Sequence, residues 1–225
     1  MVLFFIQEPA PLQTEKTLSL VELIQNGGLG GQLIIGLLFV LLLMVTYIYF
    51  ERLFAIRSAV KVSPNFMPQI RSFVMNGKLE GAQQLCLQEN VPVARLISKG
   101  LSRIGRPLDD INTAIENSGR LEVYQLEKNI SILATISGVA PMLGFLGTVI
   151  GMILSIFEIS NAGGNIDMQL LADGLYTAMT TTVAGLIVGI VGYICYNHLV
   201  VKTNKAVYQM EASSLEFLDL LNEPA

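Results

Sequence analysis

The segment from Ala134 to Phe157, ATISGVAPMLGFLGTVIGMILSIF, constrains the possible folds of this chain most strongly. It is 24 residues long and contains no charged side chain. A helix of roughly 20 apolar residues, rising about 1.5 Å per residue, is long enough to cross a bilayer. Small residues recur on one face of such a helix: Ser137, Gly144, Thr148, Gly151 and Ser155. Because small residues let helix backbones approach closely in lipid, the segment is predicted to be a span buried against other helices.

The composition is that of a membrane protein. Of the 225 residues, 52% are hydrophobic and 14% are charged, whereas soluble domains average about 25% charged residues. The net charge of −4 gives no indication of a nucleic-acid partner. The two cysteines, Cys86 and Cys195, lack metal-site spacing and are interpreted as reduced, buried thiols. His198 is the single histidine, which excludes a multi-histidine metal site. We therefore expect neither a metal nor a cofactor.

Three apolar segments predict an all-α integral membrane protein with three transmembrane helices. The first span is expected at 32–50, the second within one long helix over 108–157, and the third within 173–221. The last two helices are expected to extend well beyond the membrane, because helical sequence without a breaking pair continues past their apolar parts.

The remaining segments connect these spans. Residues 1–31 are predicted to contain a short amphipathic helix, from Thr17 to Gln25, lying in the membrane interface. Residues 51–107 are predicted to form a small helical domain, punctuated by proline and glycine, and 158–172 a short connection.

Lysine and arginine counts predict the orientation. Residues 51–133 carry eleven of them, and 158–172 carry none. The positive-inside rule then places the N-terminus outside, and the helical domain and the C-terminus in the cytoplasm.

The third span is rich in hydroxyl groups, and two readings of it stay open. Its threonines are Thr177, Thr180, Thr181 and Thr182. Together with Thr148 and Ser155 of the second span they could line a polar path. Alternatively, the hydroxyls donate to backbone carbonyls of their own helix, and these residues serve only in helix packing. Glycines at small-xxx-small spacing have the same packing role. The candidate packing glycines are Gly144, Gly147, Gly151, Gly185 and Gly189.

Neither hydroxyl-rich span has a carboxylate, lysine or histidine in its middle. Threonine cannot take up and release a proton at neutral pH, so the titrating group of any ion path must come from another chain. No enzymatic constellation is visible, and the glycine clusters lack a phosphate-binding loop pattern. Glu116, Glu122 and Glu127 are read as a solvated helix face or as an acidic ring around a cytoplasmic vestibule.

Two stretches resemble the MotA/TolQ/ExbB proton-channel family: LATISGVAPMLGFLGTVIGMI at 133–153 and GLYTAMTTTVAGLIVGI at 174–190. The long motif A-P-x-L-G-x-L-G-T-V-x-G-M-I carries the likeness, and three spans with a domain between the first two resemble its ExbB and TolQ branches. The resemblance maps the family's pore threonines to Thr148 and Thr182. Many ExbB chains have a glutamate where this chain has Thr177.

The resemblance also implies a function and partners. It implies an inner-membrane homopentamer that encloses a dimer of a single-span partner like ExbD or TolR, whose aspartate takes the proton. The proton motive force would then energise TonB-dependent outer-membrane transport. Alternatives are a subunit of the Tol–Pal system, a gliding or flagellar stator, and a membrane scaffold that conducts nothing. The N-terminus would be periplasmic and the C-terminus cytoplasmic, with membrane lipids around the spans.

Overall fold

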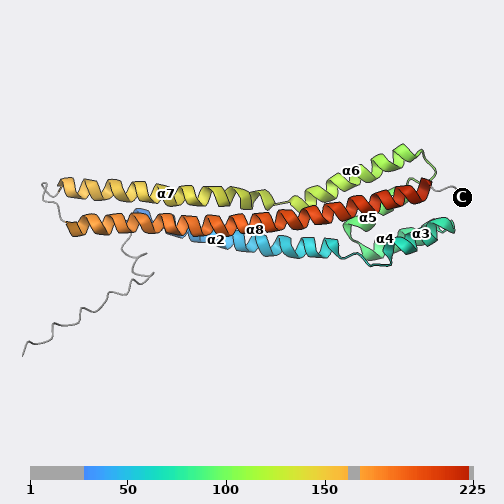
Figure 1. Ribbon diagram of the computed structural model, residues 1–225, viewed down its shortest axis with the longest axis horizontal. Helices are drawn as coiled ribbons and strands as arrows, with labels where there is room; N and C mark the ends of the chain where they lie inside the picture. The colour runs from blue at the N-terminus through green and yellow to red at the C-terminus, as the bar shows by residue number, and fades with distance from the viewer. Residues whose placement is uncertain (1–27, 162–167, 223–225) are drawn as a thin grey trace, which may run out of the picture.

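Long apolar sequence runs give this protein long helices. The computed structural model describes residues 28–161 and 168–222, and all regular structure within these ranges is helical. In chain order the helices are α2 (Gly28–Val60), α3 (Phe66–Met75), α4 (Leu79–Glu89), α5 (Pro92–Leu101), α6 (Leu108–Glu127), α7 (Ile130–Asn161) and α8 (Met168–Asn222). They form one elongated bundle (Figure 1).

Three long helices make the apolar end of this bundle. α7 and α8 run side by side in opposite directions, and α2 packs against both (Figure 1). Stretches long and apolar enough to cross a membrane are found within Gly30–Val60, Leu108–Asn161 and Gly174–Asn222. The expected all-α fold with three candidate membrane spans is confirmed.

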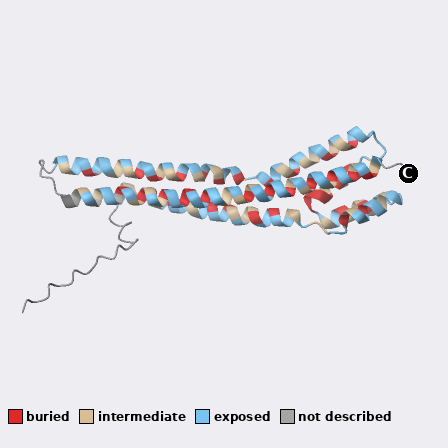
Figure 2. Ribbon diagram, viewed as in Figure 1, coloured by how far each residue is buried: buried red, intermediate tan, exposed pale blue. Residues whose placement is uncertain are grey.

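The apolar end carries its hydrophobic side chains outward as well as inward. Met142 and Phe145 of α7, for example, are 70% and 66% exposed. Exposed positions alternate with buried ones along all three long helices (Figure 2). Such an apolar outer surface is unfavourable in water and suits lipid or neighbouring membrane helices.

The opposite end of the bundle is a helical domain with an ordinary apolar core. Helices α3, α5 and α6 pack against the C-terminal half of α8, and α4 packs against α3 and α5 (Figure 1). The fully buried ring of Phe217 from α8 is seated against α5 at Gly100, where an added Cβ would lie 2.5 Å from that ring. Gly100 thus allows α5 and α8 to pack closely around one aromatic side chain.

The expected single helix over 108–157 is wrong. Instead α6 ends at Glu127 and α7 begins at Ile130, with Lys128 and Asn129 between them. Asn129 has a φ of 65°, in the left-handed region that asparagine tolerates better than most residues, and Lys128 is extended with a ψ of 132°. No proline or glycine pair marks this break, so pattern reasoning missed it.

Several other expected boundaries also shift. Helix α2 begins at Gly28, before the expected start of the first span at Gln32, and continues ten residues past Phe50 to Val60. The connection expected at 158–172 is shorter, because α7 extends to Asn161 and α8 already begins at Met168. The amphipathic helix expected at 17–25 lies outside the described residues.

Cys86 of α4 provides a test of the helical domain's core. Its side chain is 2% exposed, and burial raises the pKa of its thiol from 9.0 to about 11. The folded protein therefore holds this proton more tightly than the unfolded chain. The resulting contribution to the free energy of unfolding is fully present below pH 9. It falls by about 2 kcal/mol as the pH rises from 9 to 11.

We expect wild-type protein to lose more stability between pH 8.5 and pH 10.5 than a Cys86→Ala variant does. The measurement is thermal unfolding of both proteins in the same detergent, so that every other titrating group is common to both. Equal pH slopes for the two proteins would show that burial does not hold the Cys86 proton.

Candidate functional site

The candidate site is the seam between α7 and α8, where glycines bring the two backbones together. A Cβ added at Gly144 would lie 2.8 Å from the carbonyl oxygen of Thr181 and 3.1 Å from the Cα of Gly185. A Cβ added at Gly185 would lie 2.6 Å from the carbonyl oxygen of Ala140. Real Cβ atoms do not approach backbone atoms so closely, so only glycine fits at this crossing.

The other expected packing glycines lie along the same seam. Gly147 faces the side chain of Thr181, Gly151 faces Ala178, and Gly189 faces the ring of Pro141. The sequence did not single out Ala178 or Pro141, because their role depends on the register between α7 and α8.

Two threonine hydroxyls cross the seam to one carbonyl group. Thr182 Oγ1 donates to the carbonyl oxygen of Gly144 at 3.0 Å. Thr181 Oγ1 lies 3.2 Å from the same oxygen and 2.7 Å from the carbonyl oxygen of Ala178. These bonds fix the helix pair at the level where the backbones are closest.

The hydroxyls of Thr181 and Thr182 lie on different edges of the seam. In a helix each residue turns by about 100°, so Thr148 lies about 40° to one side of Gly144. Thr182 lies about 60° from Gly185 in the same rotational sense. Because α7 and α8 are antiparallel, equal rotational senses about the two helix axes point to the same edge. Thr148 and Thr182 therefore share one edge. Gly147 and Thr181 occupy the other edge by the same geometry, in agreement with their direct contact.

Helix α2 covers one of these edges. Gly30 of α2 faces Ile150, which lies on the Gly147 and Thr181 edge of the seam, and Thr181 is fully buried. Thr148 and Thr182 are only half-buried, on the edge that α2 leaves open. Thr148 Oγ1 donates to the carbonyl oxygen of Phe145 at 2.6 Å. Neighbouring side chains on this open edge, such as Phe145 and Met179, are large, apolar and exposed, and the two threonines add hydroxyl groups beside them.

Two of the expected path residues, Thr181 and Ser155, are buried between α7 and α8. Thr181 lies inside the seam rather than on its open edge, and Ser155 is 5% exposed, donates to the carbonyl oxygen of Gly151 and packs on Gly174. Both therefore serve contacts between α7 and α8 in this chain. Thr177 belongs to α8, but its side chain lies outside the described residues.

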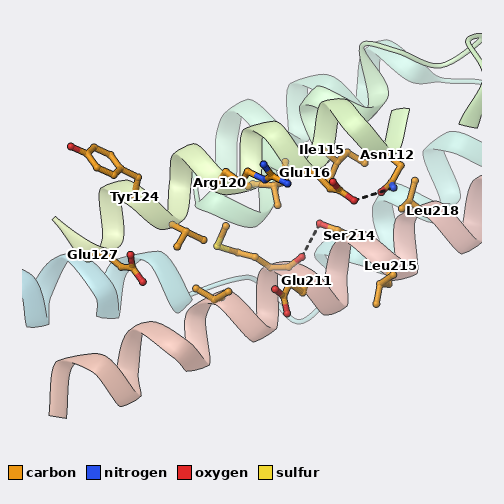
Figure 3. A pocket seen from close by; sticks show the side chains of 15 residues that line it. Asn112, Ile115, Glu116, Arg120, Tyr124, Glu127, Glu211, Ser214, Leu215 and Leu218 are labelled. Carbon is orange, nitrogen blue, oxygen red and sulfur yellow. Dashed lines mark hydrogen bonds between the residues drawn. The ribbon is translucent and has the colours of Figure 1, made fainter. Parts of the chain in front are cut away.

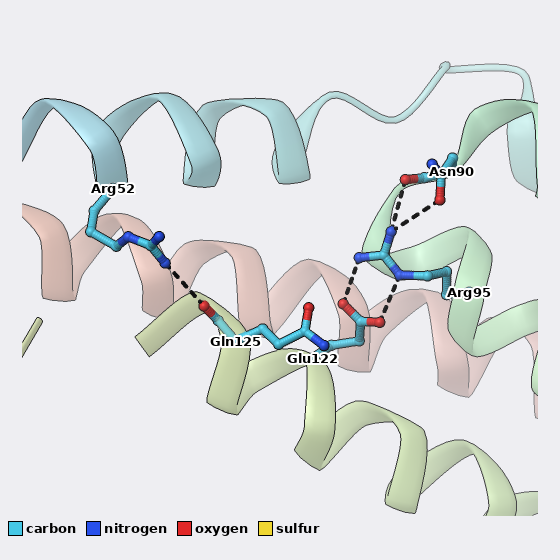
Figure 4. A network of polar contacts seen from close by, with 5 residues as sticks. All are labelled: Arg52, Asn90, Arg95, Glu122 and Gln125. Atoms are coloured by element: carbon cyan, nitrogen blue, oxygen red, sulfur yellow. Dashed lines mark hydrogen bonds and ion pairs between the residues drawn. The ribbon is translucent and has the colours of Figure 1, made fainter. Parts of the chain in front are cut away.

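The three glutamates expected to form a vestibule do not share one environment. Glu122 is 7% exposed, and its two carboxylate oxygens accept hydrogen bonds from Nε and Nη2 of Arg95, both at 2.6 Å (Figure 4). Hydrogen bonding to Glu122 raises the pKa of the Arg95 guanidinium, although burial opposes this. Glu122 is therefore part of an internal ion pair between α5 and α6, which corrects the expectation of a solvated face.

Glu116 and Glu127, by contrast, are exposed at the rim of a groove of about 690 Å³ between α6 and α8 (Figure 3). Glu116 accepts a hydrogen bond from the side-chain amide of Asn112. Apolar side chains such as Val123 and Met210 also line the groove. Arg120 lines it too, so the rim is not purely acidic.

Two polar contacts fasten α2 to the rest of the bundle. Arg52 Nη1 donates to the carbonyl oxygen of Gln125 at 3.3 Å, near the C-terminus of α6 (Figure 4), and its guanidinium also pairs with Glu51. A cation at a helix C-terminus is favourable because the last carbonyls lack helical partners. Tyr49 Oη lies 2.8 Å from Nδ1 of His198 on α8. Sequence reasoning did not pair these residues, since each contact joins distant segments.

Within residues 28–161 and 168–222, no group of three or more histidine, cysteine, aspartate or glutamate side chains is placed to hold a metal ion.

Comparison with known proteins identifies the family. Residues 88–212 match the model of the MotA/TolQ/ExbB proton channel family. An ExbB homologue from Methanothermobacter thermautotrophicus is 31% identical over 156 residues, which is 67% of this chain and 54% of that protein. The biopolymer transport protein ExbB of Aquifex aeolicus is 38% identical over 112 residues, 48% of this chain and 74% of the relative.

The Tol-Pal system protein TolQ of Haemophilus influenzae is 31% identical over 105 residues, 46% of this chain and 45% of its own length. This chain thus spans about half the length of the archaeal and the TolQ relatives. The matched region includes α5–α7 and most of α8, and so contains the whole seam. The chain belongs to the MotA/TolQ/ExbB proton channel family.

Proposed function

We propose that this chain is the proton-conducting motor subunit of an inner-membrane complex that uses the proton motive force to energise TonB-dependent outer-membrane transport. The observation that carries the proposal is the placement of Thr148 and Thr182 on one open edge of the α7–α8 seam, with α2 on the other edge. An open edge of this kind suits a pore wall, and α2 on the covered edge suits contact with lipid.

The partners follow from what this wall lacks. The central parts of both hydroxyl-bearing spans carry no titratable carboxylate, lysine or histidine, so a second protein must supply the group that takes the proton. We propose a pentamer of this chain around a dimer of a single-span protein like ExbD or TolR, whose aspartate faces Thr148 and Thr182. A TonB-like protein would receive the work.

The topology belongs to the same proposal. The helical domain carries most of the lysines and arginines, so we place it and the C-terminus in the cytoplasm and the N-terminus in the periplasm. Glu116 and Glu127, at the rim of the groove between α6 and α8, would then face a cytoplasmic vestibule.

We expect Thr148→Ala and Thr182→Val each to reduce partner-dependent proton flux at least about tenfold, because each removes a hydroxyl from the pore wall. The measurement is dye-detected proton uptake into vesicles that contain the complex with its single-span partner, normalised to assembled complex. Thr46→Val is the control, since the Thr46 hydroxyl on α2 bonds its own helix at the carbonyl oxygen of Leu42.

Thr181→Val makes a sharper comparison, because it changes the adjacent residue on the covered edge. It should lower stability by about 1 kcal/mol while flux per folded complex stays near the wild-type value. Full flux in both Thr148→Ala and Thr182→Val would contradict the pore assignment and favour a scaffold that conducts nothing.

A Tol–Pal role is the second candidate, supported by the similarity to TolQ. Genetic complementation distinguishes the TonB-linked role from the Tol-linked role. A TonB-linked subunit restores TonB-dependent uptake in a strain lacking ExbB, whereas a Tol-linked subunit restores detergent resistance in a strain lacking TolQ.

A further inference from the structure

The break between α6 and α7 opens a second pocket, distinct from the seam. Its volume is about 580 Å³, and it lies where the apolar part of α8 gives way to its polar C-terminal half. The lining residues come from both sides of the break and from the facing turns of α8: Tyr124, Glu127, Lys128, Asn129, Ile130, Ser131, Tyr196, Val200, Thr203 and Asn204.

The N-terminus of α7 supplies positive potential to this pocket. The first N–H groups of a helix have no carbonyl partner within that helix, and the dipole of a long helix favours an anion there. Ile130 and Ser131 are the first two residues of α7, and both line the pocket. Lys128, two residues before Ile130, adds a full positive charge and forms no ion pair with any described residue.

Thr203 provides a second and independent indication of a ligand. Its side chain is 1% exposed, it lines the pocket, and its Oγ1 has no hydrogen-bond partner among the described residues. Other hydroxyls of α8 are satisfied on their own helix, for example Thr180 on Tyr176 and Ser214 on Met210. A buried hydroxyl without a partner costs free energy, so a bound group that accepts its hydrogen bond would remove this cost.

We propose that this pocket binds a phosphate group. Its donors are side-chain hydroxyls, side-chain amides, the Lys128 ammonium and the first backbone N–H groups of α7. Together they match an oxyanion with several acceptor oxygens. Glu127 is the opposing charge among the lining residues and limits the affinity. The phosphate can belong to a phospholipid headgroup or to a soluble phosphate, since both present the same oxyanion.

The test uses the full-length chain in the oligomer that it forms in dodecyl maltoside. Binding is followed by the thermal unfolding midpoint, because a ligand of the folded state raises it in a saturable manner. One arm titrates inorganic phosphate at constant ionic strength against chloride. The other titrates dioleoylphosphatidylglycerol against dioleoylglycerol, which has the same chains without the phosphate.

We expect at least one phosphate probe to raise the unfolding midpoint in a saturable manner. Dioleoylglycerol should change the midpoint only by the general effect of its acyl chains. Thr203→Val and Lys128→Met should each weaken apparent affinity at least about fivefold, and Glu127→Gln should strengthen it. Lys205→Met is the matched control, because Lys205 is an exposed lysine of α8 that does not line the pocket. Its affinity should equal that of the wild type.

Each outcome decides the question. A response to the lipid alone identifies a headgroup site, and a response to inorganic phosphate identifies a site open to soluble anions. No saturable response in the wild type overturns the proposal. Wild-type affinity in Thr203→Val overturns it as well, and this nearly isosteric variant remains informative if Lys128→Met fails to assemble. The assay measures no transport, so its result is separate from that of the proposed function.

Discussion

Replacing Gly185 with alanine is expected to destabilise the protein by about 3 kcal/mol. The new Cβ would lie 2.6 Å from the carbonyl oxygen of Ala140 and 2.8 Å from the Cα of Gly144. Both contacts are with backbone, which cannot rotate away as a flexible side chain can, so α7 and α8 must separate locally. That separation would also lengthen the hydrogen bonds from Thr181 and Thr182 to Gly144.

The measurement is the thermal unfolding midpoint of the full chain in detergent, which should fall by about 6–12 °C for a chain of this size. Gly138→Ala is the matched control, because Gly138 lies on α7 with nothing within 4 Å of the added Cβ. Alanine favours a helix over glycine by about 1 kcal/mol, so this control should be neutral or stabilising. A Gly185→Ala protein as stable as Gly138→Ala would show that the backbones do not touch at this crossing.

Removal of the Glu122 carboxylate is expected to have the next largest effect on stability. Glu122→Ala leaves the Arg95 guanidinium without the two 2.6 Å hydrogen bonds that it donates to this carboxylate. Breaking a buried ion pair costs about 3–5 kcal/mol. Because the Arg95 side chain is 40% exposed, water can solvate its charge in part. We therefore expect a loss of about 3 kcal/mol.

Arg95 also donates to the backbone carbonyl and the side-chain oxygen of Asn90, which ends α4 in the left-handed conformation. Loss of Glu122 should thus loosen α4, α5 and α6 together, seen as faster amide hydrogen exchange in all three helices. Glu116→Ala is the control, since Glu116 is an exposed glutamate on the same helix with one long contact to Asn112. Equal stability of the two variants would contradict an internal role for Glu122.

The glycine seam shows how far a sequence pattern can lead. Spacing by three and four identified Gly144, Gly151 and Gly185 as one class of residue, and the structure places all three between α7 and α8. Spacing could not decide which hydroxyls lie on the open edge of that seam. Thr181 and Thr182 are adjacent in sequence, yet the position of α2 buries the first and leaves the second half-exposed.

The acidic residues of α6 show the same limit. Glu116, Glu122 and Glu127 looked alike as charges on one polar helix. The partner that distinguishes Glu122 is Arg95, 27 residues earlier on α5, and long-range pairs of this kind leave no periodic signal in a sequence.

The sequence alone determined the all-helical class, the three apolar spans and the family motif, because hydrophobic runs of membrane length and glycine spacing are local properties of the chain. Only the tertiary structure decided the break at Lys128 and Asn129, the ion pair of Glu122 and the open edge that carries Thr148 and Thr182. Each of these depends on contacts between helices that are distant in sequence, and the free energy of such contacts exceeds the weak local preferences of the residues involved.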